Sequence, residues 1–592
     1  MCLLYLIASA TMMLVFMRVG CGAANGLKRV VPRRSSSLRA VVDPELPGAE
    51  ATGVVKNGGS TVEYPNFSFV VNRGPDLGHK GRTGILETPH GTIETPNFVF
   101  CATKAAMKTI TPDQLRAEKS QIILSNTYHL MLTPGSDLVE KMGGLQKFTG
   151  WRGPMLTDSG GYQIFSMGHG SVSSDIKGKR DTVAMGWNQT LLAIDEEGAT
   201  FRSYVDGAVH HLTPERSMEI QRQLGADLIV VLDECTPFNV DKAYTEASMH
   251  RSHRWALRSL NAFAKSHSGK QALYGIIQGG IYRDLRDASA AYINEHSFFG
   301  TAIGGSLGAD KQTMHDIVAY TRSRVRDDRP VHLLGIGGVR DVFHGVRQGI
   351  DTFDCVHPTR LGRHGGVLVD TAHWDEEPWG DVAETSMTVA EKKKVETLLR
   401  KELNRLVMAK GRIEQLENQA TAGGGESVTV QLSRKKDSAS APLDRQEVTR
   451  RMRLIAAKLE SGIADASDPE LALLGVRGVP IQSRKLQATA RTVREHINVG
   501  KGNMRSDPRP IDSKCSCYTC RNFSRAYLHH LFKAKESIGG TLCTIHNVAF
   551  MNRLMEDIRT GIKTGTLDNV EKAYVHPLLQ DSISEGSMGI GT

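Results

Sequence analysis

Three cysteines and one histidine near the C-terminus have the residue types and the spacing of a metal site. Cys515, Cys517 and Cys520 lie within six positions of a 592-residue chain that holds only nine cysteines, and His546 follows them. Zinc binds three thiolates and one imidazole tetrahedrally, and four protein ligands leave no open position for water or substrate. The pattern predicts one structural Zn²⁺ per chain and places the chemistry elsewhere.

Free cysteines without a metal are the alternative interpretation of this cluster. The remaining cysteines are dispersed and indicate no disulfide framework; they are Cys2, Cys21, Cys101, Cys235, Cys355 and Cys543. A catalytic zinc of the deaminase type would require a His-x-Glu and a Pro-Cys-x-x-Cys motif. The chain contains neither motif, which disfavours that type of site.

Asp158 and Asp354 are the candidates for the chemistry. Asp158 lies in Thr157-Asp-Ser-Gly-Gly-Tyr-Gln163, and Asp354 precedes Cys355 and the basic stretch 358–365. Two carboxylates that converge from different loops suit one nucleophile and one general acid/base, the division of labour in glycosyl transfer. Taken separately, each aspartate is more commonly a helix cap or a turn residue.

Short β-like runs that end in polar or glycine residues recur from about Asn66 onward, with helix-like segments between them. The runs are Ile122–Leu124, Asp227–Leu232, Leu273–Ile277, His332–Ile336 and Asp351–Phe353. Such units over roughly 300 residues predict an α/β fold, most simply a (β/α)8 TIM barrel, whose strand C-terminal ends face the active site. A doubly wound sheet is the alternative, but no Gly-x-Gly-x-x-Gly opens a helix after the first strand.

Composition and charge fit a soluble globular protein with a mild basic excess. Hydrophobic residues make up 40% of the chain and charged residues 23%, which is ordinary, and the net charge is +9. An excess of this size is compatible with a polyanionic partner such as RNA.

The N-terminal segment differs from everything after it. Leu3–Phe16 is an apolar run too short to span a bilayer comfortably, and a basic, serine-rich stretch without acidic residues continues to Asp43. Two targeting signals in series have this form. We expect import into an organelle, a plastid ahead of a mitochondrion, and no membrane segment in the mature protein. A mitochondrial presequence or a misassigned start codon, which would leave the protein in the cytoplasm, are the alternatives.

These patterns divide the chain into four parts. Residues 1–64 are the targeting extension, 65–370 the barrel, 371–494 a charged and partly helical insertion, and 495–592 the zinc-binding subdomain with C-terminal helices. Apolar residues at helical spacing among charges predict an exposed helix in the insertion; they are Val395, Leu398, Leu399, Leu403, Leu406 and Leu416. The insertion is either a flexible appendage or an additional RNA contact.

The ordered set of motifs closely resembles tRNA-guanine transglycosylase of the bacterial type. The matching segments are Ser125–Leu130, Leu156–Gln163, His210–Ser217, Asp233–Pro237, Gln278–Gly280, Gly304–Gly305, Phe353–Arg360 and the Cys3His cluster. The resemblance covers 66–370 and 495–575, and it implies a TIM barrel with an inserted C-terminal zinc-binding subdomain.

The resemblance also implies an activity and the role of each matching residue. The activity is exchange of guanine at the wobble position of tRNAs with a G-U-N anticodon for a 7-deazaguanine. Asp354 would be the nucleophile that holds the RNA as a covalent ester, and Asp158 the general acid/base. Arg360 and Arg363 would bind RNA, although a solvated surface explains each alone as well. The residues assigned to the base are Ser159, Tyr162, Asp233, Gln278, Gly305 and Gly308.

Two features bear on which base is inserted. Gly308 stands where bacterial relatives usually have valine and eukaryotic relatives glycine, which would leave room for the cyclopentenediol of queuine. Asp233-Glu-Cys-Thr-Pro237 is the bacterial version of its motif. Queuine is therefore expected slightly ahead of 7-aminomethyl-7-deazaguanine. The other partners implied are tRNA and a second copy of the chain, in a homodimer built partly from the zinc-binding subdomain.

Two other functions are weighed against this one. A non-catalytic tRNA-binding partner subunit would keep the barrel and the zinc but lose the nucleophile, whereas Asp354 and Asp158 are both present. Archaeosine-type exchange elsewhere in tRNA would normally come with an added C-terminal RNA-binding domain.

Overall fold

The computed structural model describes residues 62–73, 78–168, 190–236, 238, 240–373, 389–420, 444–461 and 495–576. All but the last three residues of the predicted targeting extension 1–64 lie outside these ranges. Within the described ranges, no helix combines the length and the apolar character needed to cross a membrane.

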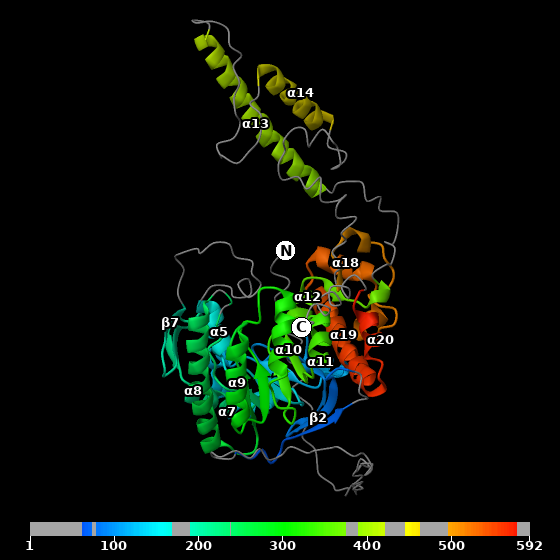
Figure 1. Ribbon diagram of the computed structural model, residues 1–592. Helices are drawn as coiled ribbons and strands as arrows, with labels where there is room; N and C mark the ends of the chain where they lie inside the picture. The colour runs from blue at the N-terminus through cyan, green and yellow to red at the C-terminus, as the bar shows by residue number, and fades with distance from the viewer. Residues whose placement is uncertain are drawn as a thin grey trace, which may run out of the picture. The chain divides into compact units, whose positions relative to one another are not determined.

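Eight parallel strands close into a barrel, which confirms the predicted (β/α)8 fold (Figure 1). In chain order they are β4 (Asn97–Cys101), β5 (Ile123–Ser125), β6 (Met155–Thr157), β10 (Leu228–Val230), β11 (Ala272–Ile277), β12 (Gly300–Ile303), β13 (Val331–Leu333) and β14 (Thr352–Cys355). The last strand pairs with the first, with Asp354 opposite Val99. Nearly every residue of these strands is buried, because helices cover a parallel barrel from outside and side chains fill it from inside.

Helices between the strands form the outer layer of the barrel. They include α7 (Pro214–Leu224), α8 (Lys242–Ser266), α9 (Arg283–Glu295), α10 (Lys311–Arg322) and α11 (Val339–Arg347), and each contacts the next along the chain. Helix α7 begins at a threonine cap: Oγ1 of Thr213 accepts the N–H of Arg216 at 3.1 Å, and proline occupies the first helical position.

Two antiparallel sheets are added to the barrel. Strands β1 (Ser68–Arg73), β2 (Arg82–Thr88) and β3 (Gly91–Thr95) form one, and β7 (Leu191–Ile194), β8 (Ala199–Arg202) and β9 (Val209–Leu212) the other. A fully buried ion pair joins the first sheet to the barrel: Nη2 of Arg82 lies 2.6 Å from Oδ2 of Asp351, just before β14. The same oxygen accepts the Val331 N–H at 2.7 Å, so the pair also fixes the start of β13.

The chain leaves and re-enters the core through a two-stranded ribbon. Strand β15 (Gly366–Leu368) pairs antiparallel with β16 (His496–Asn498). Between them, α13 (Val389–Ala420) and α14 (Arg445–Ser461) pack on each other as a helical hairpin. Its interface is apolar and fully buried, with Leu399, Leu406 and Ile413 on α13 and Val448 and Ile455 on α14.

The C-terminal subdomain is organised by α19 (Ser537–Thr564), which packs on α12 (His357–Arg363) behind β14. Asn547 of α19 is fully buried and has its amide saturated. It accepts the N–H of Leu368 at 2.9 Å and donates to the carbonyls of Pro358 at 2.9 Å and Gly366 at 3.0 Å. One side chain thereby ties the helix to the segment that follows the candidate nucleophile.

We predict that Asn547→Ala destabilises the fold by at least about 3 kcal/mol. The substitution leaves three buried backbone groups without a hydrogen-bond partner, and each such group costs about 1–3 kcal/mol. Urea unfolding followed by tryptophan fluorescence measures the change. Asn261→Ala, on the exposed face of α8, is the matched control and should shift stability by less than about 0.5 kcal/mol. Equal stability of the two variants would contradict the assigned contact.

Candidate functional site

Asp354 is the next-to-last residue of β14, and its two carboxylate oxygens have different surroundings. Oδ1 accepts the N–H of Gly335 at 2.8 Å and lies 3.2 Å from Nε2 of His332. Among the described residues, the hydrogen-bond partner of Oδ2 is the thiol of Cys101, at 3.6 Å, and a thiol is a weak donor. One oxygen is therefore held in place while the other keeps lone pairs available.

His332 lies on β13 and is fully buried beside Asp354. Its Nδ1 is 2.8 Å from the hydroxyl of Thr352. Because Nε2 faces a carboxylate, Nε2 carries the hydrogen and Nδ1 accepts the hydroxyl proton. This pair of contacts fixes the ring, and the ring fixes Oδ1.

Asp158 directly follows β6 and accepts hydrogen bonds from the start of α2 (Thr127–Leu132). Oδ1 accepts the Thr127 N–H at 2.7 Å, and Oδ2 accepts the side-chain amide of Asn126. Burial raises the pKa of Asp158 to about 6 against the effect of these donors, and the charge of Asp354 raises it further. A carboxyl with such a pKa can take up and return a proton near neutral pH.

A third carboxylate, that of Asp233, is buried and lies close to Asp158. Asp233, after β10, accepts the amide of Gln278 at 2.5 Å and the hydroxyl of Ser159 at 3.4 Å. All three side chains are buried. Burial raises the pKa of Asp233 to about 6, although both hydrogen bonds lower it. Three of the six residues predicted to contact the base are thus brought together.

Gly305 completes this group because no side chain fits at its position. Its φ is +79°, and a Cβ there would lie 2.2 Å from Oε1 of Gln278. The Gln278 amide can therefore lie against the backbone of the loop after β12.

Gly308 does not open onto free space. Its φ is +124°, and a Cβ would lie 2.7 Å from Cγ2 of Thr313. Asp310 holds Thr313 in place, with Oδ2 accepting the threonine hydroxyl at 2.7 Å. Both the backbone conformation and the contact with Thr313 therefore require glycine at this position. Because a Cβ would point toward Thr313, the structure does not support the interpretation that Gly308 widens the base pocket.

Tyr162, Arg360 and Arg363 lie nearer the surface. Tyr162, on α5 (Gly161–Gly168), is 41% exposed. Burial of its hydroxyl raises the pKa of Tyr162 to about 12, and the charge of Arg360 opposes the rise. Arg360 is exposed and Arg363 half-buried on α12. Among the described residues, no carboxylate forms an ion pair with either arginine.

Arg286 is a site residue that the sequence did not reveal. It belongs to α9 and is fully buried, and burial lowers its pKa to about 9. It donates to the carbonyls of Gly280 at 2.8 Å and Gly304 at 2.9 Å. One cation therefore fixes the two loops that carry Gln278 and Gly305. His332 was not predicted as a site residue either. An arginine in a helix usually lies at the surface, so the sequence gives no sign of the role of Arg286. For His332 there was one sign, because a histidine is unusual at the start of an apolar strand.

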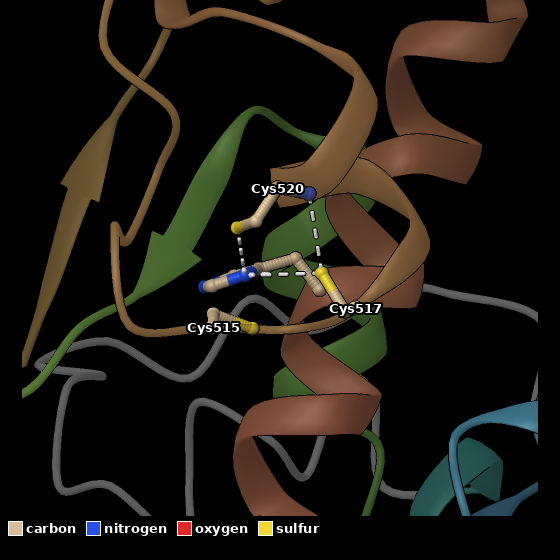
Figure 2. A group of neighbouring side chains, drawn as sticks. Cys515, Cys517 and Cys520 are labelled. Atoms are coloured by element: carbon tan, nitrogen blue, oxygen red, sulfur yellow. Dashed lines mark hydrogen bonds between the residues drawn. The ribbon is translucent and has the colours of Figure 1, made fainter.

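The four predicted metal ligands meet between α17 (Tyr518–Asn522) and α19 (Figure 2). They are all buried and their ligand atoms lie within 4.8 Å of one another. Nδ1 of His546 is 3.8 Å from Sγ of Cys517 and 3.3 Å from Sγ of Cys520. A tetrahedral zinc with ordinary bond lengths separates sulfur from nitrogen by about 3.6 Å, so the donor set fits Zn²⁺.

A carbonyl orients the histidine of this set. Nε2 of His546 lies 2.8 Å from the Leu368 oxygen, so it carries the hydrogen and leaves Nδ1 free to bind a metal. Such outer hydrogen bonds fix the tautomer of metal-binding histidines.

The buried charge of Asp233 predicts a pH-dependent gain of stability in Asp233→Asn. The folded-state pKa lies above the usual 3.8, so protonation favours the fold and wild-type stability falls as the pH rises from about 4 to 6. The variant lacks this loss and should be more stable than wild type at pH 8 by about 3 kcal/mol. The gain should vanish toward pH 4.

Thermal unfolding of both proteins across this pH range measures the effect. Asp316→Asn, at an exposed position of α10, is the control and should show no such trend. A pH-independent difference for Asp233→Asn would show that burial of charge is not its cause.

Comparison with known proteins agrees with this architecture. A family model described as queuine tRNA-ribosyltransferase matches residues 76–401 and 483–578. The queuine tRNA-ribosyltransferase of Roseiflexus sp. (strain RS-1) is 36% identical over 80% of this chain and 90% of its own length. That of Symbiobacterium thermophilum is 33% identical over 80% of this chain and 82% of its own length. The chain belongs to the queuine tRNA-ribosyltransferase family.

Proposed function

We propose that this protein exchanges guanine at the wobble position of G-U-N anticodon tRNAs for a 7-deazaguanine base, through a covalent aspartyl-ribosyl intermediate. The asymmetric environment of Asp354 carries the proposal. One oxygen is anchored by Gly335 and His332, and within the described part of the chain the other contacts a thiol alone. A carboxylate held in this way is oriented for attack at a single atom.

In the first half of the reaction, Oδ2 of Asp354 bonds to the ribose anomeric carbon as the bond from that carbon to guanine N9 breaks. The electron pair of that bond stays on N9, and protonated Asp158 supplies the proton. In the second half, N9 of the incoming base attacks the same carbon and its proton passes to Asp158. The ester to Asp354 breaks and both carboxyl groups return to their initial states. A pKa of about 6 at Asp158 suits both transfers.

Recognition of the base is assigned to the buried group around Asp233. An ionised Asp233 has only acceptors and matches the N–H donors on the Watson–Crick edge of guanine. The Gln278 side chain and the N–H of Gly305 are assigned to the purine oxygen, and the Tyr162 ring to its face. Because these polar groups are desolvated, a base lacking the matching pattern would leave them unpaired. Arg360 and Arg363 are assigned to RNA phosphates.

Queuine is the incoming base that we propose, ahead of 7-aminomethyl-7-deazaguanine. The similarity to bacterial proteins named queuine tRNA-ribosyltransferase supports this choice, while the geometry of Gly308 does not. Competition between the two bases for insertion into one tRNA tests it. Preferential insertion of the aminomethyl base would overturn it.

We predict that the purified protein alone exchanges radiolabelled guanine into a G-U-N tRNA, and that Asp354→Asn lowers the rate at least about 1,000-fold, as expected for loss of a nucleophile. Denaturing gels should show a protein–RNA adduct with the wild type and none with the variant. A wild type that binds tRNA without exchange would instead indicate the non-catalytic partner subunit. Exchange by Asp354→Asn at the wild-type rate would show that the nucleophile is another group.

We propose that the metal is a structural zinc ion and that the subdomain it stabilises forms a homodimer. A row of aromatic residues supports the dimer, with Tyr518 48% exposed and Tyr527 42% exposed. Phe523 lies between them, its ring centroid 5.8 Å from Tyr518 and 5.3 Å from Tyr527. Exposed aromatic clusters of this kind are typical of subunit contacts.

Loss of the zinc is predicted to abolish folding of the subdomain and assembly, because a closed site stabilises structure and supplies no reacting group. Cys517→Ala should lose the metal, melt at lower temperature and give a one-chain mass by light scattering. Cys543→Ala, at a buried cysteine outside the metal set, should keep one zinc per chain. A metal-free protein that stayed folded, dimeric and active would contradict the assignment.

A further inference from the structure

An exposed aromatic ring with lysines around it lies beside the Asp158 site. Tyr204, after β8, is 41% exposed, and Nζ of Lys104 lies 5.4 Å from its ring centroid. The Tyr204 hydroxyl is 3.0 Å from Nδ1 of His129. We name Tyr204, His129, Lys104 and Lys108 the tyrosine platform.

The platform is joined to the catalytic group by very short stretches of chain. Lys104 follows Thr103, whose carbonyl accepts the N–H of Asn126 at 3.1 Å. His129 stands two residues after Thr127 on α2. Asn126 and Thr127 are the two donors to Asp158. A polymer with one unit at Asp158 would therefore bring an adjacent unit within reach of Tyr204.

Buried aromatic rings hold the ring of Tyr204 in place, and the exposed side chain of Lys104 lies over it. Tyr128, buried to 1% exposure, stacks behind it at 6.0 Å between centroids and 28° between planes. Phe201, equally buried, supports Tyr128 at 5.2 Å. Because the ring is fixed before a ligand arrives, stacking on it costs little conformational entropy.

The charge at the platform is positive and uncompensated. Lys104 and Lys108 are exposed, and among the described residues neither forms an ion pair with a carboxylate. His129 lies close to both lysines; its pKa is lowered first by burial and then by their charges. A ligand that both stacks and carries negative charge matches this surface.

We propose that the tyrosine platform is a subsite for an unpaired nucleotide that flanks the exchanged one. Its base stacks on Tyr204, and Lys104 and Lys108 bind its phosphates. An aromatic ring beside unpaired cations is the usual means of binding single-stranded RNA without reading its sequence. The inference rests on the proposed function in taking an RNA loop as the ligand.

Fluorescence anisotropy with the full-length protein and a labelled G-U-N anticodon stem-loop tests the subsite without requiring turnover. Tyr204→Ala should weaken binding about tenfold, in the range for loss of one base–aromatic stack. Tyr204→Phe keeps the ring and should bind within about twofold of wild type. The stacking loss should be independent of salt.

The role of Lys104 is tested separately, by the salt dependence of binding in the same assay. Lys104→Ala should reduce the slope of log affinity against log salt by about 0.7, the value for one phosphate contact on a single strand. Lys104→Arg should preserve the slope. Lys265→Ala, at the exposed end of α8, removes an equal charge elsewhere and should leave affinity and slope unchanged.

Three results would overturn the subsite. The first is binding of the stem-loop by Tyr204→Ala with wild-type affinity. The second is an unchanged salt slope in Lys104→Ala. If Tyr204→Ala fails to fold, the lysine variant still tests the subsite. A fall in oligomeric mass by light scattering in either variant is the third, since it would make the platform a subunit contact. A wild type that binds the stem-loop but exchanges no base would contradict the proposed function and leave the subsite intact.

Discussion

Two neighbouring residues of α19 bind both backbone polar groups of Leu368, and this contact joins the barrel to the metal-binding subdomain. Asn547 accepts the Leu368 N–H while His546 donates to the Leu368 carbonyl. Asn547 also reaches Pro358, four residues after Asp354. The imidazole that faces the three thiols and the segment behind the nucleophile are therefore oriented by one turn of one helix. A structural metal can matter to such a site without touching substrate, because it determines where that helix turn lies.

The chemistry of the site depends on burying carboxyl groups among neutral donors. Burial raises the pKa of Asp158 and of Asp233 to about 6, against the hydrogen bonds that each accepts. In the part of the chain that the structure describes, no arginine or lysine forms an ion pair with either one. Arg286, the buried cation nearby, binds carbonyls of the loops instead. Burying these two carboxylates destabilises the fold when they are ionised. It also gives the site carboxyl groups that can exchange a proton or bind a base near neutral pH.

Motif matching and geometry diverge most clearly at Gly308. A difference in residue type there suggests a change of pocket size, on the assumption that a side chain would enter the pocket. The backbone has φ +124° and directs a Cβ at Thr313. A substitution pattern tells which residue occupies a position, whereas the direction of the Cα–Cβ bond follows from φ and ψ, which the surrounding loop determines.

The sequence by itself determined the fold class, the metal ligands and the pair of candidate catalytic aspartates. Strand periodicity and the clustering of cysteines are local patterns, which can be recognised from the sequence alone. Only the tertiary structure decided that His332 anchors one oxygen of Asp354, that Arg286 joins two loops, and that Lys104 lies over Tyr204. These contacts join residues from different strands and loops. They form only when the barrel closes, because closure sets both their separation and the loss of water that gives them strength.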